Sequence, residues 1–194
     1  RSAWTDSSMK RIAVLLCLLA LNACDCGKGP PPLTLTDAAG QSREPFKADA
    51  RKATVLVFLM ADCPVCQATS PELARLFADF SPKGVAFFGV YATETAPEIT
   101  EYHQSYSLPF PGLLDPAQKL ARLAGATIAP QAAVFSPDKQ LLYLGRIDDR
   151  AVTLGTMRPE PSRRDLRLVL ESVMAGKKVE PKFTESVGCY LPEK

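Results

Sequence analysis

One segment constrains this chain more than any other: an apolar run over residues 53–60 that leads into Cys63-Pro64-Val65-Cys66. A near-continuous run rich in valine and leucine is typical of a strand covered on both faces of a parallel or mixed sheet. Apolar residues then recur at roughly helical spacing, namely Val65, Leu73, Leu76, Phe77 and Phe80. The order therefore predicts a buried strand, a pair of cysteines and a helix in direct succession.

Apolar and helical stretches continue to alternate along the chain. Strands are expected over residues 33–36, 84–91, 113–114, 131–135 and 140–145, with another near Phe46, and helices over residues 96–106, 117–123 and 163–175. Ser162 is the expected N-cap of the last helix and Gly176 its end. Strands separated by helices, then a hairpin and a helix, predict an α/β/α sandwich with a central mixed sheet.

Residues 9–24 have the pattern of a targeting segment. Lys10 and Arg11 follow Met9, and an apolar run over residues 12–21 precedes Cys24, which together are typical of a secretory signal. The run has about half of the ~20 residues that a membrane-spanning helix needs. Leu21-Asn22-Ala23-Cys24 resembles a bacterial lipobox, which implies a lipid on Cys24. The alternative is that residues 12–23 form a buried helix.

These observations divide the chain into four parts. Residues 1–23 are upstream residues plus a lipoprotein-type signal peptide, and residues 24–32 are a Gly/Pro/Lys spacer. Residues 33–176 are the globular domain, and residues 177–194 are an extended tail that carries Cys189. We therefore expect a protein of the bacterial cell envelope, held to the membrane by its N-terminal lipid and facing the periplasm or the exterior.

Charge and cysteine content exclude two classes of protein. Without residues 1–23, the 23 basic and 21 acidic residues become 20 and 20, and this balance argues against nucleic-acid binding. Structural zinc needs about four Cys or His ligands in two paired spacings, whereas here one pair is followed by single His103 and Cys189. In an envelope where disulfides persist, a C-x-x-C pair instead indicates redox chemistry.

Four features together resemble a known family. They are Cys63-Pro64-Val65-Cys66, Pro71 five residues later, Ala129-Pro130 at the start of a strand, and an insertion containing residues 108–116. This pattern resembles the thioredoxin superfamily, and within it the redoxin (AhpC/TSA, TlpA/ResA-like) branch, over about residues 33–175. The resemblance implies a thioredoxin-like fold and a thiol-disulfide oxidoreductase acting as a monomer on a protein partner.

The resemblance also assigns roles to residues. Cys63, at the N-terminus of a helix, is the attacking thiolate, since unpaired N–H groups and the helix dipole favour its ionisation. Its sulfur should be accessible to solvent. Cys66 is the resolving thiol, and Ala129, cis-Pro130 and Pro64 bind substrate. Electrons pass through the cysteines themselves, so no cofactor is expected.

The chain departs from the family pattern at several positions. Ala61 replaces the usual tryptophan, and Asp62 should oppose thiolate formation at Cys63 by charge repulsion. No acidic residue interrupts residues 55–60, so a buried carboxylate is missing there; Glu94 or Glu98 is a substitute, although solvated positions are expected for both. Because Val65 brings no histidine into the motif, a reductase or isomerase direction is favoured.

Three alternatives remain open from the sequence. A thiol peroxidase would use an arginine such as Arg146, but the threonine expected three residues before the cysteine is Met60. A copper(I) chaperone similar to the SCO proteins would bind the metal through the thiolates of Cys63 and Cys66, together with Met60, His103 or Cys189. Thiolate and thioether sulfurs are the soft ligands that copper(I) prefers. The SCO motif, however, has a C-x-x-x-C spacing, which this chain lacks. A binding module with a structural disulfide needs no reactive thiol.

Cys189 itself has three interpretations. It is a third redox thiol, a partner of Cys26 beside the lipid anchor, or a buried free cysteine, and no spacing rule decides among these. Cys17 is removed with the signal.

Overall fold

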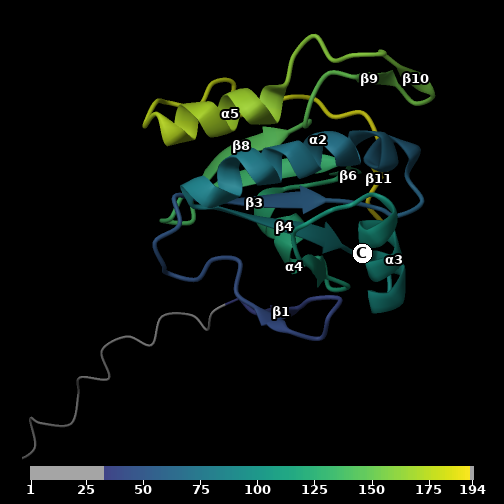
Figure 1. Cartoon of the computed structure of the whole chain (residues 1–194), viewed down its shortest axis with the longest axis horizontal. Coiled ribbons are helices and arrows are strands. Elements are labelled where there is room, and N and C mark those ends of the chain that lie inside the picture. Colours follow the sequence, from purple (N-terminus) through teal and green to yellow (C-terminus); the bar gives the residue numbers. More distant parts are fainter. Residues whose placement is uncertain (1–32, 193–194) are drawn as a thin grey trace, which may run out of the picture. The chain divides into compact units, whose positions relative to one another are not determined.

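The computed structural model describes residues 33–192 (Figure 1), so the expectations for the signal, Cys17, Cys24, Cys26 and the spacer lie outside the described residues. Among the described residues, the alternating runs form eleven strands, four α-helices and one short 3-10 helix. In chain order they are β1 (Leu35–Thr36), β2 (Ser42–Arg43), β3 (Ala53–Phe58), α2 (Pro64–Phe80), η1 (Ser81–Lys83), β4 (Val85–Tyr91), α3 (Ala96–Ser105), β5 (Gly112–Leu114), α4 (Lys119–Ala124), β6 (Ile128–Ala129), β7 (Gln131–Phe135), β8 (Leu141–Gly145), β9 (Ala151–Thr153), β10 (Thr156–Met157), α5 (Asp165–Met174) and β11 (Cys189–Tyr190).

A five-stranded mixed sheet forms the centre of the fold, in the order β5-β4-β3-β7-β8. β3 pairs parallel with β4 and antiparallel with β7, so it lies in the middle. Every residue of β3 is buried, as its continuous apolar run predicts. The mixed α/β sandwich expected from the order of elements is confirmed.

Helices α2 and α3 cover the same face of the sheet. Each connects two neighbouring parallel strands, β3 to β4 and β4 to β5, and right-handed crossovers that advance in one direction place their helices on one side. A hydrogen bond of 2.9 Å between the hydroxyls of Ser70 and Tyr102 joins the two helices. This contact lies one turn along α2 from Cys66, whose carbonyl also accepts a hydrogen bond from Ser70.

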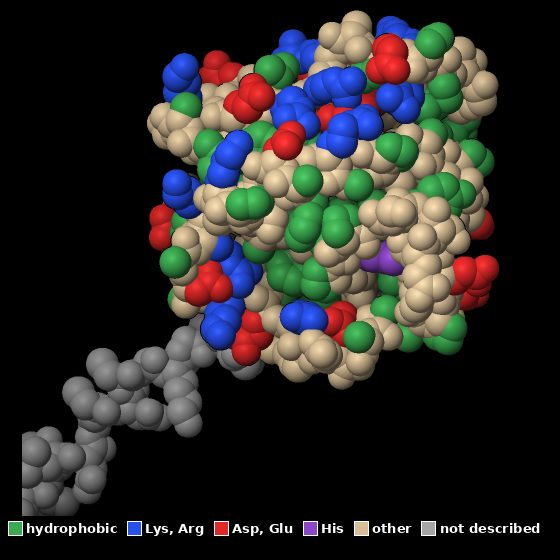
Figure 2. All heavy atoms as spheres, in the orientation of Figure 1, with side chains coloured by type: hydrophobic (Ala, Val, Ile, Leu, Met, Phe, Trp, Pro, Cys, Tyr) green, Lys and Arg blue, Asp and Glu red, His purple; other side chains and the backbone are tan. Residues whose placement is uncertain are grey.

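Helix α5 lies along α2 on the outside of the molecule (Figure 1). Glu72 of α2, 2% exposed, pairs with Arg164 and Arg75 and lies 3.7 Å from Arg167. Figure 2 shows basic side chains gathered with acidic ones along the edge formed by these helices. The basic residues there are therefore largely neutralised within the protein.

Two local expectations are wrong. The second N-terminal strand is Ser42–Arg43, because the turn at residues 37–41 is tight and returns the chain at once. Ser162 does not cap the last helix: its hydroxyl donates to the carboxylate of Asp149, and the helix begins after Arg164. The hairpin of β9 and β10 projects beyond the sheet (Figure 1) and was not expected.

The tail after α5 returns across the domain. Lys182 and Thr184 form backbone hydrogen bonds of 2.9 and 3.2 Å with Leu144 of β8. Further along, β11 pairs antiparallel with β6, with Cys189 opposite Ala129.

Among the described residues, no helix is both long and apolar enough to cross a bilayer.

Candidate active site

Cys63 occupies the N-cap position of α2, where the expected strand, cysteine pair and helix meet. Pro64 is the first residue of the helix, where its missing N–H costs nothing. Pro71 lies inside the same helix, seven residues further on. The first turn of the helix therefore directs backbone N–H groups toward the position of the Cys63 sulfur.

The Cys63 side chain is 1% exposed, so the expectation of a solvent-accessible sulfur is wrong. Its sulfur lies 3.4 Å from the carbonyl oxygen of Ala129 and 2.8 Å from the sulfur of Cys189. Ala129 and the tail both cover the sulfur, since Cys189 belongs to β11. The three described cysteines carry no disulfide.

The surroundings of the Cys63 sulfur nevertheless favour its thiolate form. Its pKa is lowered to about 5, first because the Cys66 thiol hydrogen-bonds to its sulfur, and further by Cys189 and by the backbone N–H groups of Cys66 and Val65; burial acts in the opposite direction. Asp62 is exposed to solvent, and its charge contributes to the raised pKa of the neighbouring Cys189 thiol. The hydrogen bonds to the Cys63 sulfur nevertheless lower the pKa of Cys63, so the net weakening of the thiolate expected from Asp62 is not found.

Cys66 lies behind Cys63, inside the core. Its side chain is fully buried, and burial raises the pKa of its thiol well above the usual range. It stays protonated while Cys63 is a thiolate, and it can supply the hydrogen bond that stabilises that thiolate. The two cysteines thus have the unequal environments expected of an attacking and a resolving thiol.

Ala129 and Pro130 lie on the other side of the Cys63 sulfur. The peptide bond between them is cis, as the resemblance implies. Both residues are buried, whereas Pro64 is exposed on the helix. The structure therefore brings Cys63, Cys66, Ala129, Pro130 and Cys189 together.

The two candidate carboxylates have different surroundings. Glu98 is exposed, and its carboxylate accepts a hydrogen bond from the N–H of Thr95 in the capping box of α3. Its position is therefore solvated, as expected. Glu94 is half-buried, and its carboxylate accepts a 2.9 Å hydrogen bond from the N–H of Ala61. Glu94 therefore braces the loop that carries Cys63, and the expectation that it is merely solvated is wrong.

The residues invoked for the alternatives have other partners. Arg146 is paired with Asp165 at 2.7 Å. His103 shares a 2.9 Å hydrogen bond with the hydroxyl of Tyr91. In the part of the chain that the structure describes, no group of three or more His, Cys, Asp or Glu side chains is arranged to hold a metal ion.

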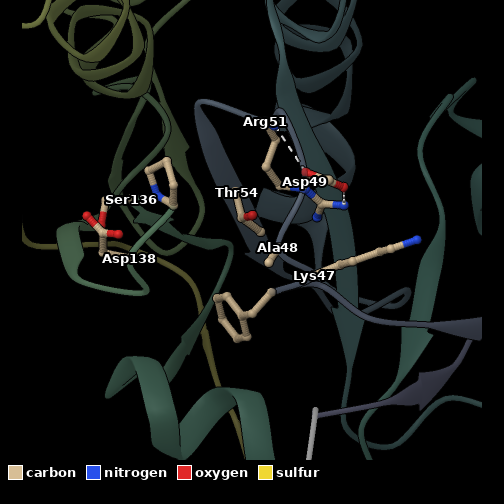
Figure 3. Close-up of a pocket in the computed structure, with 9 residues that line it drawn as sticks. Lys47, Ala48, Asp49, Arg51, Thr54, Ser136 and Asp138 are labelled. Carbon is tan, nitrogen blue, oxygen red and sulfur yellow. Dashed lines mark hydrogen bonds and ion pairs between the residues drawn. The ribbon is translucent and has the colours of Figure 1, made fainter.

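A pocket of about 460 Å³ lies at the opposite end of β3 from the cysteines (Figure 3). It is lined by the loop before β3 and by the turn between β7 and β8. Arg51 in this pocket is paired with Asp49 at 2.5 Å. Since β3 begins at Ala53 and Cys63 follows its other end, this pocket is not part of the thiol site.

Sequence reasoning missed the residues that hold the tail over the site. Leu191 donates its N–H to Thr127 at 2.9 Å, and the side-chain amide of Gln118 donates to the carbonyl of Pro192 at 2.6 Å. Gly188 packs directly on Ala129, because a Cβ at position 188 would overlap the Ala129 carbonyl. The sequence feature that could have indicated this contact is the pair Gly188-Cys189 in the C-terminal tail.

Comparison with known proteins identifies the family. The sequence profile of the AhpC/TSA family matches residues 26–144. The chain belongs to the AhpC/TSA family. This confirms the predicted redoxin branch of the thioredoxin superfamily, and the match contains both Cys63 and Cys66.

A curated relative of this AhpC/TSA protein is the thiol-disulfide oxidoreductase ResA of Bacillus thuringiensis (strain Al Hakam). It is 27% identical over 116 residues, which make up 60% of this chain and 66% of ResA. The chain therefore spans just under two thirds of the length of that relative.

Solved structures confirm the fold of this AhpC/TSA protein. A conserved protein from Geobacillus kaustophilus has a TM-score of 0.72 and 27% identity, covering 87% of this chain and 92% of its own. A secreted disulfide oxidoreductase of Mycobacterium tuberculosis, homologous to DsbE of E. coli, has a TM-score of 0.53 and 19% identity, covering 75% of this chain and 96% of its own. The thioredoxin-like α/β fold is thus confirmed.

Proposed function

We propose that the protein is a thiol-disulfide oxidoreductase that exchanges disulfides with a protein partner through Cys63 and Cys66. The observation that carries this proposal is the pair of unequal thiols at the start of α2: Cys63 with a pKa of about 5, and Cys66 buried and protonated behind it. The likeness to ResA supports the same reaction class.

The reaction has two balanced steps. The Cys63 thiolate attacks one sulfur of the partner's disulfide, forming a mixed disulfide, and the partner's other sulfur leaves as a thiolate. Cys66 then loses its proton and attacks the Cys63 sulfur, so that the second partner thiolate leaves. The partner gains two electrons and the protein holds a Cys63–Cys66 disulfide. The reverse sequence oxidises a partner dithiol, and no bound cofactor is required.

We propose that the protein acts as an isomerase or as a moderate reductase. A Cys63 pKa of about 5 lies between the values of about 7 for thioredoxin and about 3.5 for DsbA. A more stable thiolate favours the reduced protein, so the reduction potential should lie between that of thioredoxin and that of DsbA, the range that includes protein disulfide isomerase. Equilibration with glutathione measures this potential, and a value below that of thioredoxin or near that of DsbA would contradict the proposal.

We also propose that this exchange takes place in the bacterial envelope. The support is the secretory pattern before Cys24 and a C-x-x-C pair suited to a compartment where disulfides persist. A lipid on Cys24 would hold a monomer at the membrane. The balanced charge favours a protein partner over nucleic acid.

The proposed exchange is tested with insulin as a defined disulfide substrate. We expect Cys63→Ser to lower the rate of insulin reduction at least 100-fold, because the attacking sulfur is gone. Cys66→Ser combined with Cys189→Ser should leave an insulin chain linked to Cys63, releasable by dithiothreitol. Lys83→Ala, on the short helix after α2, is the matched control. A Cys63→Ser protein that reduces insulin normally would refute the proposal.

A further inference from the structure

The tail occupies the backbone edge beside the reactive sulfur. β11 pairs antiparallel with β6, placing Cys189 opposite Ala129 and Tyr190 opposite Ile128. Under the proposed function, the backbone of Ala129 is where an extended partner segment would align its own cysteine. The structure therefore shows an extended segment of this chain, with a cysteine in register, already in that position.

The sulfurs are in contact as well. The Cys189 thiol donates to the Cys63 sulfur at 2.8 Å, although the two residues are 126 positions apart in the chain. Cys66 approaches the same sulfur from the core, and Cys189 from the tail. Cys63 is thus the shared neighbour of two other thiols.

The fit of the tail depends on Gly188. A Cβ at this position would overlap the backbone carbonyl of Ala129, which cannot move aside as a flexible side chain would. The backbone of Gly188 lies outside the left-handed region, so packing and not conformation requires the glycine. Tyr190 on the other side of Cys189 is 78% exposed and imposes no such limit.

The attachment of the tail has two separate parts. Residues 182–184 are bound to β8 through the backbone of Leu144 and through the Thr184 hydroxyl, which lies 2.5 Å from that of Tyr143. Residues 189–192 are bound to β6, Thr127 and Gln118. The second part can therefore leave the sulfur while the first keeps Cys189 close by.

We propose that Cys189 is a third exchange thiol and that β11 is an internal substrate, which takes the disulfide from Cys63 and competes with the protein partner for one binding groove, defined here as the backbone edge of Ala129 beside the Cys63 sulfur. This inference rests on the proposed function of Cys63. In the step itself, the Cys189 thiolate attacks the Cys63 sulfur of the Cys63–Cys66 disulfide. A Cys63–Cys189 bond forms, the bond to Cys66 breaks, and Cys66 leaves with the electron pair and takes up a proton. No net oxidation or reduction occurs.

The same attack can release a partner. When Cys63 carries a mixed disulfide, returning Cys189 attacks the Cys63 sulfur and the partner's sulfur leaves as a thiolate. The tail then closes the groove as a Cys63–Cys189 disulfide. A partner must displace β11 before it reaches Cys63, which explains the burial of the reactive sulfur in the free protein.

The test compares full-length Cys66→Ser with Cys66→Ser/Cys189→Ser, using glutathione disulfide as oxidant and insulin as substrate. Glutathione disulfide first forms a mixed disulfide with Cys63, and Cys189 should displace the glutathione thiolate. We expect peptide mapping of Cys66→Ser to show Cys63 linked to Cys189. We expect the double variant to retain at least ten times more insulin adduct than the single variant.

The outcomes separate the two proposals. Equal adduct in both variants, with no peptide linking Cys63 to Cys189, overturns the role of Cys189 and leaves the proposed function standing. No insulin adduct in the double variant, with the linked peptide present in the single one, supports the third thiol and refutes exchange with a protein partner. Absence of both products refutes both.

Gly188→Ala provides a variant that keeps every cysteine. Because the new methyl group pushes β11 from Ala129, we expect less Cys63–Cys189 disulfide and at least a threefold faster reaction of Cys63 with insulin. Tyr190→Ala, at an exposed side chain of the same strand, is the matched control and should leave both unchanged. An unaltered disulfide yield and insulin rate in Gly188→Ala would contradict the internal-substrate role.

Discussion

At the scale of single residues, the three thiols of the site share one negative charge. The pKa of Cys63 is lowered to about 5, while burial and the neighbouring Cys63 sulfur raise that of Cys189 to about 11 and also raise that of Cys66 well above its usual range. Each protonated thiol donates to the thiolate, and each would be repelled by it if ionised. The arrangement therefore keeps the charge on the sulfur that faces the groove.

This division of charge predicts a thiolate that persists at low pH. Cys63 should be ionised above pH 5 and protonated below it, so its thiolate absorbance at 240 nm should fall with a midpoint near 5 as the pH is lowered. Cys66→Ala should move the midpoint upward, because the principal hydrogen-bond donor is lost. The reduced Cys63→Ser protein is the control and should lack the transition. A wild-type midpoint near the value of about 8.5 for free cysteine would contradict the assignment.

The positions of Cys63 and Cys66 could be predicted from sequence, because strand, spacing and helix are local patterns. The burial of Cys63 could not. Part of its cover comes from Cys189, 126 positions away, in a tail with neither period-2 nor helical spacing to reveal a strand. The lowered pKa likewise depends on contacts between thiols, and the neighbouring charge at Asp62 suggested the opposite effect.

At the scale of elements, Glu72 joins the helix that carries the cysteines to α5. Its buried carboxylate meets Arg164, Arg75 and Arg167, so it receives charged hydrogen bonds from two helices. Such bonds are worth about 1.5–3 kcal/mol each in a protein, and more when a charge is left without a partner. The arginines here reach solvent, which limits the cost of losing Glu72.

We accordingly expect Glu72→Ala to lower the free energy of unfolding by about 2 kcal/mol, measured by urea denaturation. Arg75→Ala is the matched control: this side chain is 52% exposed, and its loss should cost less than about 1 kcal/mol. Similar losses in the two variants would show that Glu72 does not join the helices as described.

Element boundaries followed from sequence where apolar periodicity was strong, as in β3, α2 and β4. They failed where side-chain hydrogen bonds decide. Ser162 had the character of an N-cap, but Asp149 accepts its hydroxyl and the helix begins later. The β9–β10 hairpin has strands of three and two residues with mainly exposed side chains, too short for alternation to indicate a strand.

At the scale of the whole molecule, the tail connects the end of the chain to its middle. The Cys63–Cys66 disulfide closes a loop of four residues, whereas a Cys63–Cys189 disulfide would close one that spans 126 positions. A cross-link restricts the unfolded chain more when its loop is longer. The two disulfides therefore differ in their effect on stability although they share one sulfur.

This difference gives a measurement that is independent of any substrate. The chain-entropy relation gives about 2 kcal/mol for the short loop and about 5 kcal/mol for the long one. Among the cysteines that the structure describes, Cys66→Ser can form only the long loop through Cys63, so oxidation should stabilise it by about 3 kcal/mol more than it stabilises Cys189→Ser. Urea denaturation of each variant, oxidised and reduced, with the linked cysteines identified by peptide mapping, measures both increments. Equal increments would mean that Cys189 does not close the tail onto Cys63, whereas the expected excess would mean that the oxidised tail locks the groove.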